Sequence, residues 1–115
     1  MQVSFDPARD ALIARPVGRV DEASWEEFGS ILARGVDRAS EDDRETLIID
    51  LSGIDYMSSR GLRVLTTTKA RAIAAGVSIR LAAPNDVMRE ILAISRYDRL
   101  FDVDDKLPNS DRSLP

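Results

Sequence analysis

The chain contains no cysteine and no histidine among its 115 residues. The absence of cysteine excludes disulfides, thiol nucleophiles and cysteine-ligated zinc, and the absence of histidine removes the most frequent general base and metal ligand. Aromatic residues make up only 5% of the chain, so the core has to be built mainly from aliphatic side chains. We therefore expect no metal, no cofactor and none of the common catalytic constellations.

The chain also lacks long hydrophobic runs and an excess of positive charge. No apolar stretch approaches the roughly 20 residues that a membrane-spanning helix requires, and the first residues lack the basic flank and apolar run of a signal peptide. Lys and Arg number 16 against 20 Asp and Glu, which gives a formal net charge of −4. A clustered basic surface for nucleic acid is not expected. These features predict a cytoplasmic protein without a membrane span, monomeric or weakly dimeric.

The order of hydrophobic periodicities predicts an α/β fold with the sequence β, β, α, β, α, β, α. Alternation over residues 3–5, turn residues at 6–10 and an apolar run at 11–17 predict an antiparallel hairpin. Pro16 places the second strand of this hairpin near an edge or a bulge. Residues 46–51 have the continuous apolar pattern of a central strand that is covered on both faces.

Two longer helices are predicted between the strands. Large apolar residues at a spacing of three and four predict the first helix over residues 22–39, with Trp25, Phe28 and Leu32 on its buried face. The second helix is predicted over residues 59–75, and its apolar face includes Leu65. Small residues on that face favour close packing against the sheet, so all four of these large side chains are expected in the core.

The last third of the chain is predicted to add a strand, a short helix and a closing segment. Residues 77–81 have the pattern of a strand, Asn85 is suited to cap a third helix, and residues 100–103 are expected to close the fold. The result is an open mixed β-sheet with an N-terminal antiparallel hairpin and βα units. We expect one domain over residues 1–104 and a polar tail over residues 105–115.

Partners of open parallel sheets bind where strands end and helices begin, which directs attention to residues 50–65. This run reads Asp-Leu-Ser-Gly-Ile-Asp-Tyr-Met-Ser-Ser-Arg-Gly-Leu-Arg-Val-Leu. It resembles the signature of STAS domains, and specifically that of single-domain anti-sigma factor antagonists. Shorter matches at residues 18–21, 82–85 and 98–101 support the resemblance, which extends over roughly residues 3–103.

The resemblance implies a non-enzymatic interaction module that is switched by phosphorylation. The family's phosphorylated serine lies two residues before the glycine and corresponds to Ser59, with Ser58 as the alternative. This sequence departs from the pattern at two positions, because Ser58 replaces the usual aspartate and Arg60 replaces the usual Ser or Thr. If the aspartate helps a kinase to recognise the serine, phosphorylation here would be slower, shifted to Ser58, or absent.

The residues of this region also have plain structural interpretations. Ser58, Ser59 and Asp21 are all suited to cap helices. A phosphate at a helix N-terminus is stabilised by free N–H groups and the helix dipole, yet it adds about −1.5 to −2 charges to a surface that a partner must cover. By the resemblance, Asp21 is an interface residue. Arg60 and Arg63 are interpreted as solvated charges, as contacts to an acidic partner, or as compensation for the phosphate.

Two functions follow from the resemblance. In the first, the unphosphorylated chain binds a cytoplasmic anti-sigma factor or Ser/Thr protein kinase and frees the sigma factor, phosphorylation at Ser59 reverses this, and a phosphatase resets it. In the second, the same surface makes a constitutive contact in a lipid-transport ATPase or a signalling assembly. A serine hydrolase is disfavoured, because without histidine the bases for Ser59 would be Lys69, Lys106 or carboxylates that form no recognisable motif.

Overall fold

The computed structural model describes residues 1–109 as a six-stranded sheet with three α-helices and one 3₁₀ helix. The elements follow the chain as β1 Gln2–Ala8, β2 Ala11–Val20, α1 Trp25–Glu41, β3 Thr46–Asp50, β4 Ile54–Met57, α2 Ser59–Ala74, β5 Ser78–Ala82, α3 Asp86–Ser95, η1 Tyr97–Arg99 and β6 Asp102–Asp104. The predicted α/β class, the antiparallel hairpin and the βα units are confirmed. Part of the predicted polar tail, residues 110–115, lies outside the described residues.

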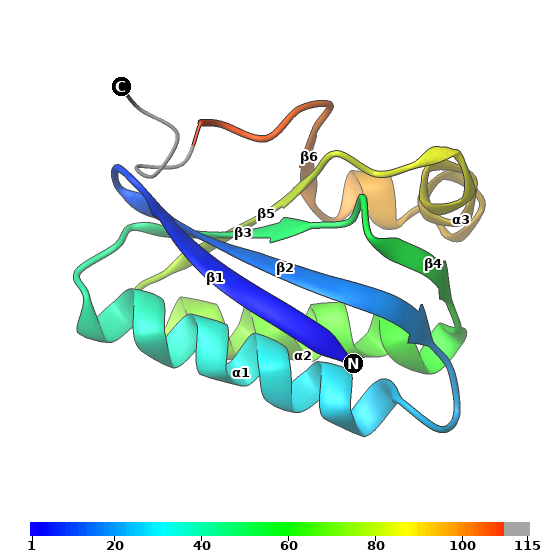
Figure 1. Ribbon diagram of the computed structural model, residues 1–115, viewed down its shortest axis with the longest axis horizontal. Helices are drawn as coiled ribbons and strands as arrows, with labels where there is room; N and C mark the ends of the chain where they lie inside the picture. The colour runs from blue at the N-terminus through cyan, green and yellow to red at the C-terminus, as the bar shows by residue number, and fades with distance from the viewer. Residues whose placement is uncertain (110–115) are drawn as a thin grey trace.

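The sheet has the order β1-β2-β3-β5-β6, and β4 pairs separately with β2 (Figure 1). Only β1 and β2 are antiparallel, and all the other pairs are parallel. The strand β3 lies between β2 and β5, as its continuous apolar pattern predicted. Its three central side chains, Leu47, Ile48 and Ile49, are buried.

The long strand β2 pairs with two parallel strands, one after the other along its length. Residues 11–14 pair with β3 and residues 18–20 pair with β4, with a register shift between Gly18 and Arg19. Pro16 lies in the interval between the two partners, where its missing N–H removes no hydrogen bond to either of them. The prediction of a nearby bulge is confirmed, although β2 continues to Val20 and does not end at residue 17.

The strand β4 is an element that the sequence pattern did not predict. Its two buried side chains, Ile54 and Met57, are three positions apart, so the segment lacks the alternation that marks a half-buried strand. The strand forms because the far end of β2 lies beside it. The predicted loop between the central strand and the second helix therefore contains a parallel strand that leads directly into α2.

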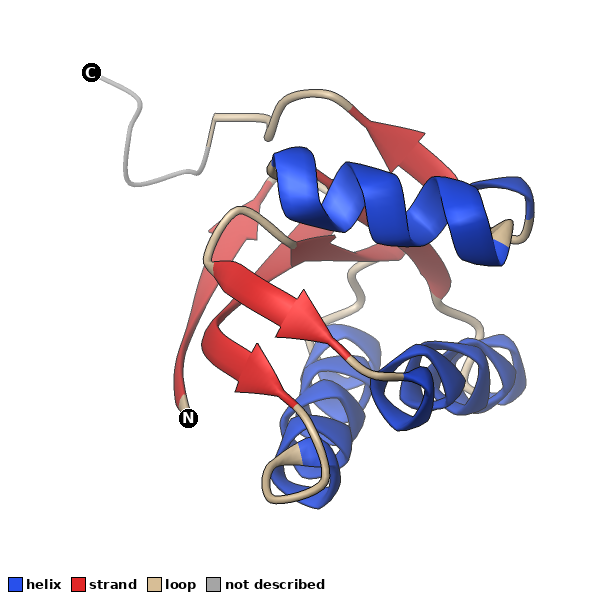
Figure 2. Ribbon diagram, turned by 90° about the vertical axis from the view of Figure 1, so that its right-hand side faces the viewer, coloured by secondary structure: helices blue, strands red, loops and turns tan. Residues whose placement is uncertain are grey.

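The helices α1 and α2 lie side by side on one face of the sheet, and α3 lies on the other side of β4 (Figures 1 and 2). The main core fills the space between the sheet and the first two helices and continues to Met88 and Leu92 of α3. Phe28, Leu32 and Leu65 are fully buried there, which confirms the prediction for these three residues. The core is mainly aliphatic, in keeping with the low aromatic content.

The prediction that Trp25 is a core residue is wrong. This side chain is only partly buried and packs at the margin of the main core. The helix α1 begins at Trp25 and not at residue 22, so the indole belongs to the first turn, where the apolar stripe of α1 meets the beginning of α2. The guanidinium carbon of Arg60 lies 5.1 Å from the centroid of the indole ring. Trp25 is therefore a surface contact between two helix ends.

Candidate functional site

The loop that follows β3 is fixed by a buried carboxylate. Asp50 is only 5% exposed, and its Oδ1 accepts a hydrogen bond of 2.9 Å from the Ser52 backbone N–H. Its Oδ2 lies 3.4 Å from Nη1 of Arg15, and Arg15 also binds Asp6. A buried charge is tolerated only when it is paired and hydrogen-bonded, and Asp50 meets both conditions. This carboxylate explains why the motif begins with aspartate at the end of the strand.

The other side of the same loop is fixed by Asn85. Its Oδ1 accepts a hydrogen bond of 2.9 Å from the Met88 N–H, which confirms the predicted N-cap of α3. Its Nδ2 donates to the backbone carbonyls of Ile54, at 2.8 Å, and Ser52, at 3.3 Å. One side chain therefore caps α3 and also holds the start of β4 in position.

The two serines at the beginning of α2 have different roles. Ser58 is the N-cap, and its Oγ accepts a hydrogen bond of 3.3 Å from the Gly61 N–H. Ser59 is the first helical residue and is exposed. Among the described residues, no group forms a hydrogen bond with its hydroxyl. The structure therefore assigns capping to Ser58 and leaves the hydroxyl of Ser59 available at the surface.

Asp21 closes the turn before α1 and does not cap the helix. Its Oδ1 accepts a hydrogen bond of 2.9 Å from the Ala23 N–H, whereas the N-cap position belongs to Ser24. The Ala23 N–H, together with the Ser24 hydroxyl and Arg19, holds the pKa of Asp21 below its usual value. The interpretation of Asp21 as a helix cap is corrected accordingly, since its hydrogen bonds shape the loop between β2 and α1.

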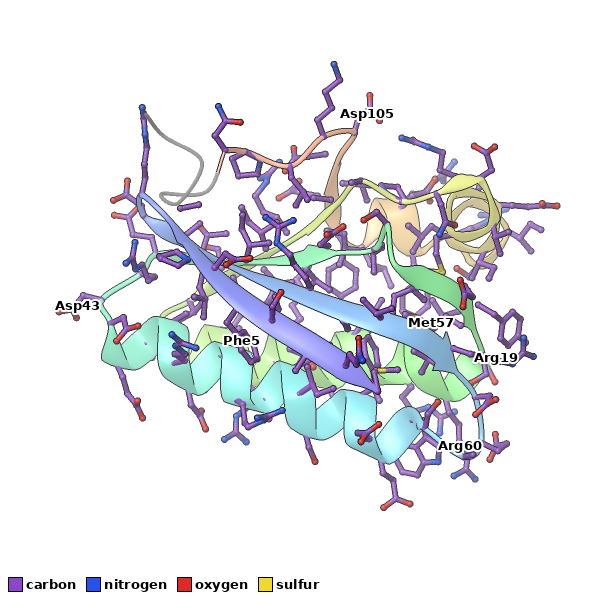
Figure 3. All side chains as sticks on the ribbon, viewed as in Figure 1. Phe5, Arg19, Asp43, Met57, Arg60 and Asp105 are labelled. Atoms are coloured by element: carbon purple, nitrogen blue, oxygen red, sulfur yellow. The ribbon has the colours of Figure 1, made fainter. Side chains whose placement is uncertain are left out.

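Two arginines stack on aromatic rings at this end of the molecule (Figure 3). The guanidinium carbon of Arg19 lies 4.2 Å from the ring centroid of Tyr56, and its Nε lies 3.2 Å from Oδ2 of Asp21. Arg60 stacks on Trp25, as described above, and its Nε lies 3.4 Å from Oε2 of Glu22. The sequence predicted Asp21 and Arg60 in this region. The contacts of these two residues with Arg19, Glu22 and Trp25 were not predicted. Tyr56 lies within residues 50–65, but its contact with Arg19 was not predicted either.

A groove of about 680 Å³ runs between α1 and α2 from this end of the molecule. Six of the residues that line it are Trp25, Gly29 and Ala33 from α1 and Arg60, Arg63 and Arg71 from α2. Small side chains after the first turn of α1 leave room, and three arginines line the opposite wall together with valine and threonine side chains. Ser59 does not line the groove, but it belongs to the same first two turns of α2 as Arg60 and Arg63, which do.

The sequence of nearly the whole chain matches one protein family. Residues 3–110 match the STAS domain family. The chain belongs to this family. The resemblance noted in residues 50–65 is thus confirmed, and the match includes the loop from β3 to α2.

Proteins described as anti-sigma factor antagonists are similar to this chain in sequence or in fold. The Bordetella bronchiseptica protein described as "Putative anti-sigma factor antagonist BtrV" is 29% identical over 103 residues, which cover 90% of this chain and 85% of that protein. An anti-sigma factor antagonist from Mycobacterium paratuberculosis superposes with a TM-score of 0.72 at 18% identity, covering 92% of this chain and 86% of the other. The unphosphorylated form of SpoIIAA from Bacillus superposes with a TM-score of 0.66 at 14% identity, covering 89% and 87%. The structural likeness establishes the STAS fold.

The described part of this STAS domain offers groups suited to protein contact. Within residues 1–109, no helix is both long enough and apolar enough to cross a membrane. The same residues contain no group of three or more carboxylates that would hold a metal ion. The end of the molecule where α2 begins presents the exposed hydroxyl of Ser59, two arginines over aromatic rings and the groove between α1 and α2.

Replacing both Arg60 and Arg63 with alanine is expected to leave the melting temperature of this STAS domain nearly unchanged. Exposed ion pairs contribute little to stability, and a cation–π contact at an exposed site contributes only about 0.5–1 kcal/mol. Arg60 makes both kinds of contact and is about half exposed, with a relative accessibility of 51%. Thermal unfolding followed by circular dichroism measures the effect. A loss of more than about 2 kcal/mol would instead show that these arginines hold the helix ends together.

Proposed function

We propose that this protein is an anti-sigma factor antagonist that works by binding and not by catalysis. In its unphosphorylated form it binds a cytoplasmic anti-sigma factor or Ser/Thr protein kinase and thereby frees the sigma factor held by that protein. The observation that carries the proposal is the exposed, unbonded hydroxyl of Ser59 beside a serine that already caps the helix. Of the two serines, Ser59 is the one that a kinase can modify without removing a cap.

Phosphorylation of Ser59 would switch the binding surface without refolding the domain. The phosphate adds about −1.5 to −2 charges and three acceptor oxygens. The beginning of a helix tolerates this charge, because its N–H groups and dipole favour anions. A partner that covers Ser59 would instead have to desolvate the phosphate, which weakens binding. ATP belongs to the kinase in this scheme, and a separate phosphatase restores the active form.

Variants of the two serines test the proposal. Ser59→Ala is expected to bind the partner and to resist inactivation by kinase and ATP. Ser59→Asp is expected to bind about tenfold more weakly or worse, since an unpaired charge in an interface costs at least about 1.4 kcal/mol. Ser58→Ala is the matched control. It loses the helix cap, at a cost of about 1 kcal/mol, and should still be phosphorylated on Ser59.

Mass spectrometry of peptides after incubation with the cognate kinase and ATP locates the phosphate. Label on Ser58 would show that the modified position is shifted by one residue. Absence of label on both serines would reject the switch and favour the second candidate, a constitutive STAS subunit of a lipid-transport ATPase or a signalling assembly. The observation that favours this candidate is Ser58 itself, which stands where antagonists of this family usually carry an aspartate.

Capture of partners from the native cytosol distinguishes the two candidates directly. The unmodified protein and the Ser59→Asp variant would serve as baits, with bound proteins identified by mass spectrometry. An anti-sigma factor or kinase that binds only the unmodified bait supports the antagonist. An ABC ATPase that binds both baits equally supports the constitutive subunit.

A further inference from the structure

The three arginines on the α2 wall of the groove differ in how they are paired. Arg71, at one end, binds Asp37 with three hydrogen bonds of 2.9–3.3 Å. Arg60, at the other end, is held by Glu22 and Trp25. Arg63 lies between them and is exposed. Within residues 1–109, no group forms an ion pair or a hydrogen bond with its guanidinium.

Arg63, whose guanidinium is unpaired, lies on the same face of α2 as Ser59. Ser59 and Arg63 are four positions apart in α2, and side chains at this spacing are neighbours on a helix surface. Long side chains in a helix point back toward its N-terminus, which favours positions of the Arg63 side chain near the turn that begins with Ser59. Arg60 is adjacent to Ser59 in sequence, yet it is turned by about 100° around the helix and is engaged with α1.

We propose that Arg63 is the internal counter-ion of a phosphate on Ser59. The modification itself rests on the proposed function, and the pairing with Arg63 goes beyond it. In the unmodified protein, the guanidinium is open to a carboxylate of the partner. In the phosphorylated protein, it pairs with the phosphate, because arginine and phosphate form strong charge-assisted hydrogen bonds. Phosphorylation therefore adds negative charge at the surface and also withdraws the one unpaired cation among the three arginines of the groove wall.

The proposal can be tested without any kinase or partner. Phosphoserine would be placed at position 59 by genetic encoding, and the second pKa of the phosphate, ordinarily about 6, would be followed by phosphorus NMR during a pH titration. A neighbouring cation stabilises the dianion and lowers this pKa. We expect the pKa to rise by about 0.3 units or more at low salt when Arg63 is replaced by glutamine, with Arg63→Lys restoring most of the shift.

The matched control is Arg60→Gln, which removes a cation that is nearer to Ser59 in the sequence but lies on another face of the helix. This variant is expected to change the phosphate pKa by less than half as much as Arg63→Gln. The other charged groups at this end of the molecule, Arg19, Asp21 and Glu22 and Glu26 in the groove, are the same in both variants. Arg60→Gln also frees Glu22 from its ion pair, and a freed carboxylate raises the phosphate pKa further, so a larger shift in Arg63→Gln still reports the effect of Arg63.

Two results would overturn the pairing. One is an equal phosphate pKa in the Arg63→Gln variant and the parent protein, and the other is a larger shift in Arg60→Gln than in Arg63→Gln. Circular dichroism confirms that each variant is folded, which is expected because both arginines are exposed. Because phosphoserine is installed directly, failure of this test leaves the kinase experiment unaffected. Failure of the kinase to label Ser59 likewise leaves the measured pairing unaffected.

Discussion

Gly61→Ala is expected to destabilise the domain by about 1–3 kcal/mol, the usual cost of overpacking a close contact. A Cβ atom on Gly61 would lie 2.5 Å from Cγ of Met57 and 2.7 Å from Cγ1 of Val20. Val20 is β-branched and fully buried, so it has little freedom to move away. The helix α2 would have to shift away from β2 and β4, and this shift would displace Ser59. Urea unfolding measures the loss of stability.

Gly29→Ala is the matched control for this substitution. Gly29 is also an interior helical residue, but a Cβ atom there would meet only Val64, at the ordinary contact distance of 3.8 Å. Alanine is favoured over glycine in helices by up to about 1 kcal/mol, so this variant should be as stable as the parent or more stable. If Gly61→Ala were equally harmless, α2 would not be in close contact with the two strands.

The sequence predicted the parts of the fold that depend on local periodicity. The central strand, the apolar faces of α1 and α2, and the cap at Asn85 each have a signal within a few neighbouring residues, and each is confirmed. The strand β4 has no such signal, because its pairing depends on the far end of β2, more than 30 residues away in the sequence. The burial of Trp25 was wrongly predicted for a similar reason. The spacing of apolar residues in a helix does not show whether its first turn packs against the sheet or against the end of another helix.

The candidate site was also predicted only in part. Its position was found from the motif in residues 50–65, which identified Ser58 and Ser59 without separating their roles. The roles are separated by a hydrogen bond from the Gly61 N–H to Ser58, which depends on the geometry of the first turn. The contacts of Arg60 with Glu22 and Trp25 could not be predicted, because they form only when the beginning of α1 lies beside the beginning of α2. Contacts between elements distant in sequence leave no pattern in a single chain.

Leu65→Ala is expected to reduce the free energy of unfolding by about 2–5 kcal/mol, the range for truncating a buried leucine. The side chain is fully buried on the face of α2 that packs into the main core. The loss combines the transfer free energy of the removed methyl groups with the cavity that remains, and a domain of this size has only about 5–15 kcal/mol of stability in total.

Ile73→Ala is the control for Leu65→Ala. It shows whether a loss of stability comes from core packing or from placing alanine in α2. Ile73 belongs to the same helix but is 70% exposed, so its truncation should change stability by no more than about 0.5 kcal/mol. Urea unfolding of both variants, with a shared slope, gives the comparison. Equal losses in the two variants would mean that α2 does not bury Leu65 against the sheet. A large loss for Leu65→Ala alone shows that the helix carrying Ser59 is anchored to the core through this face.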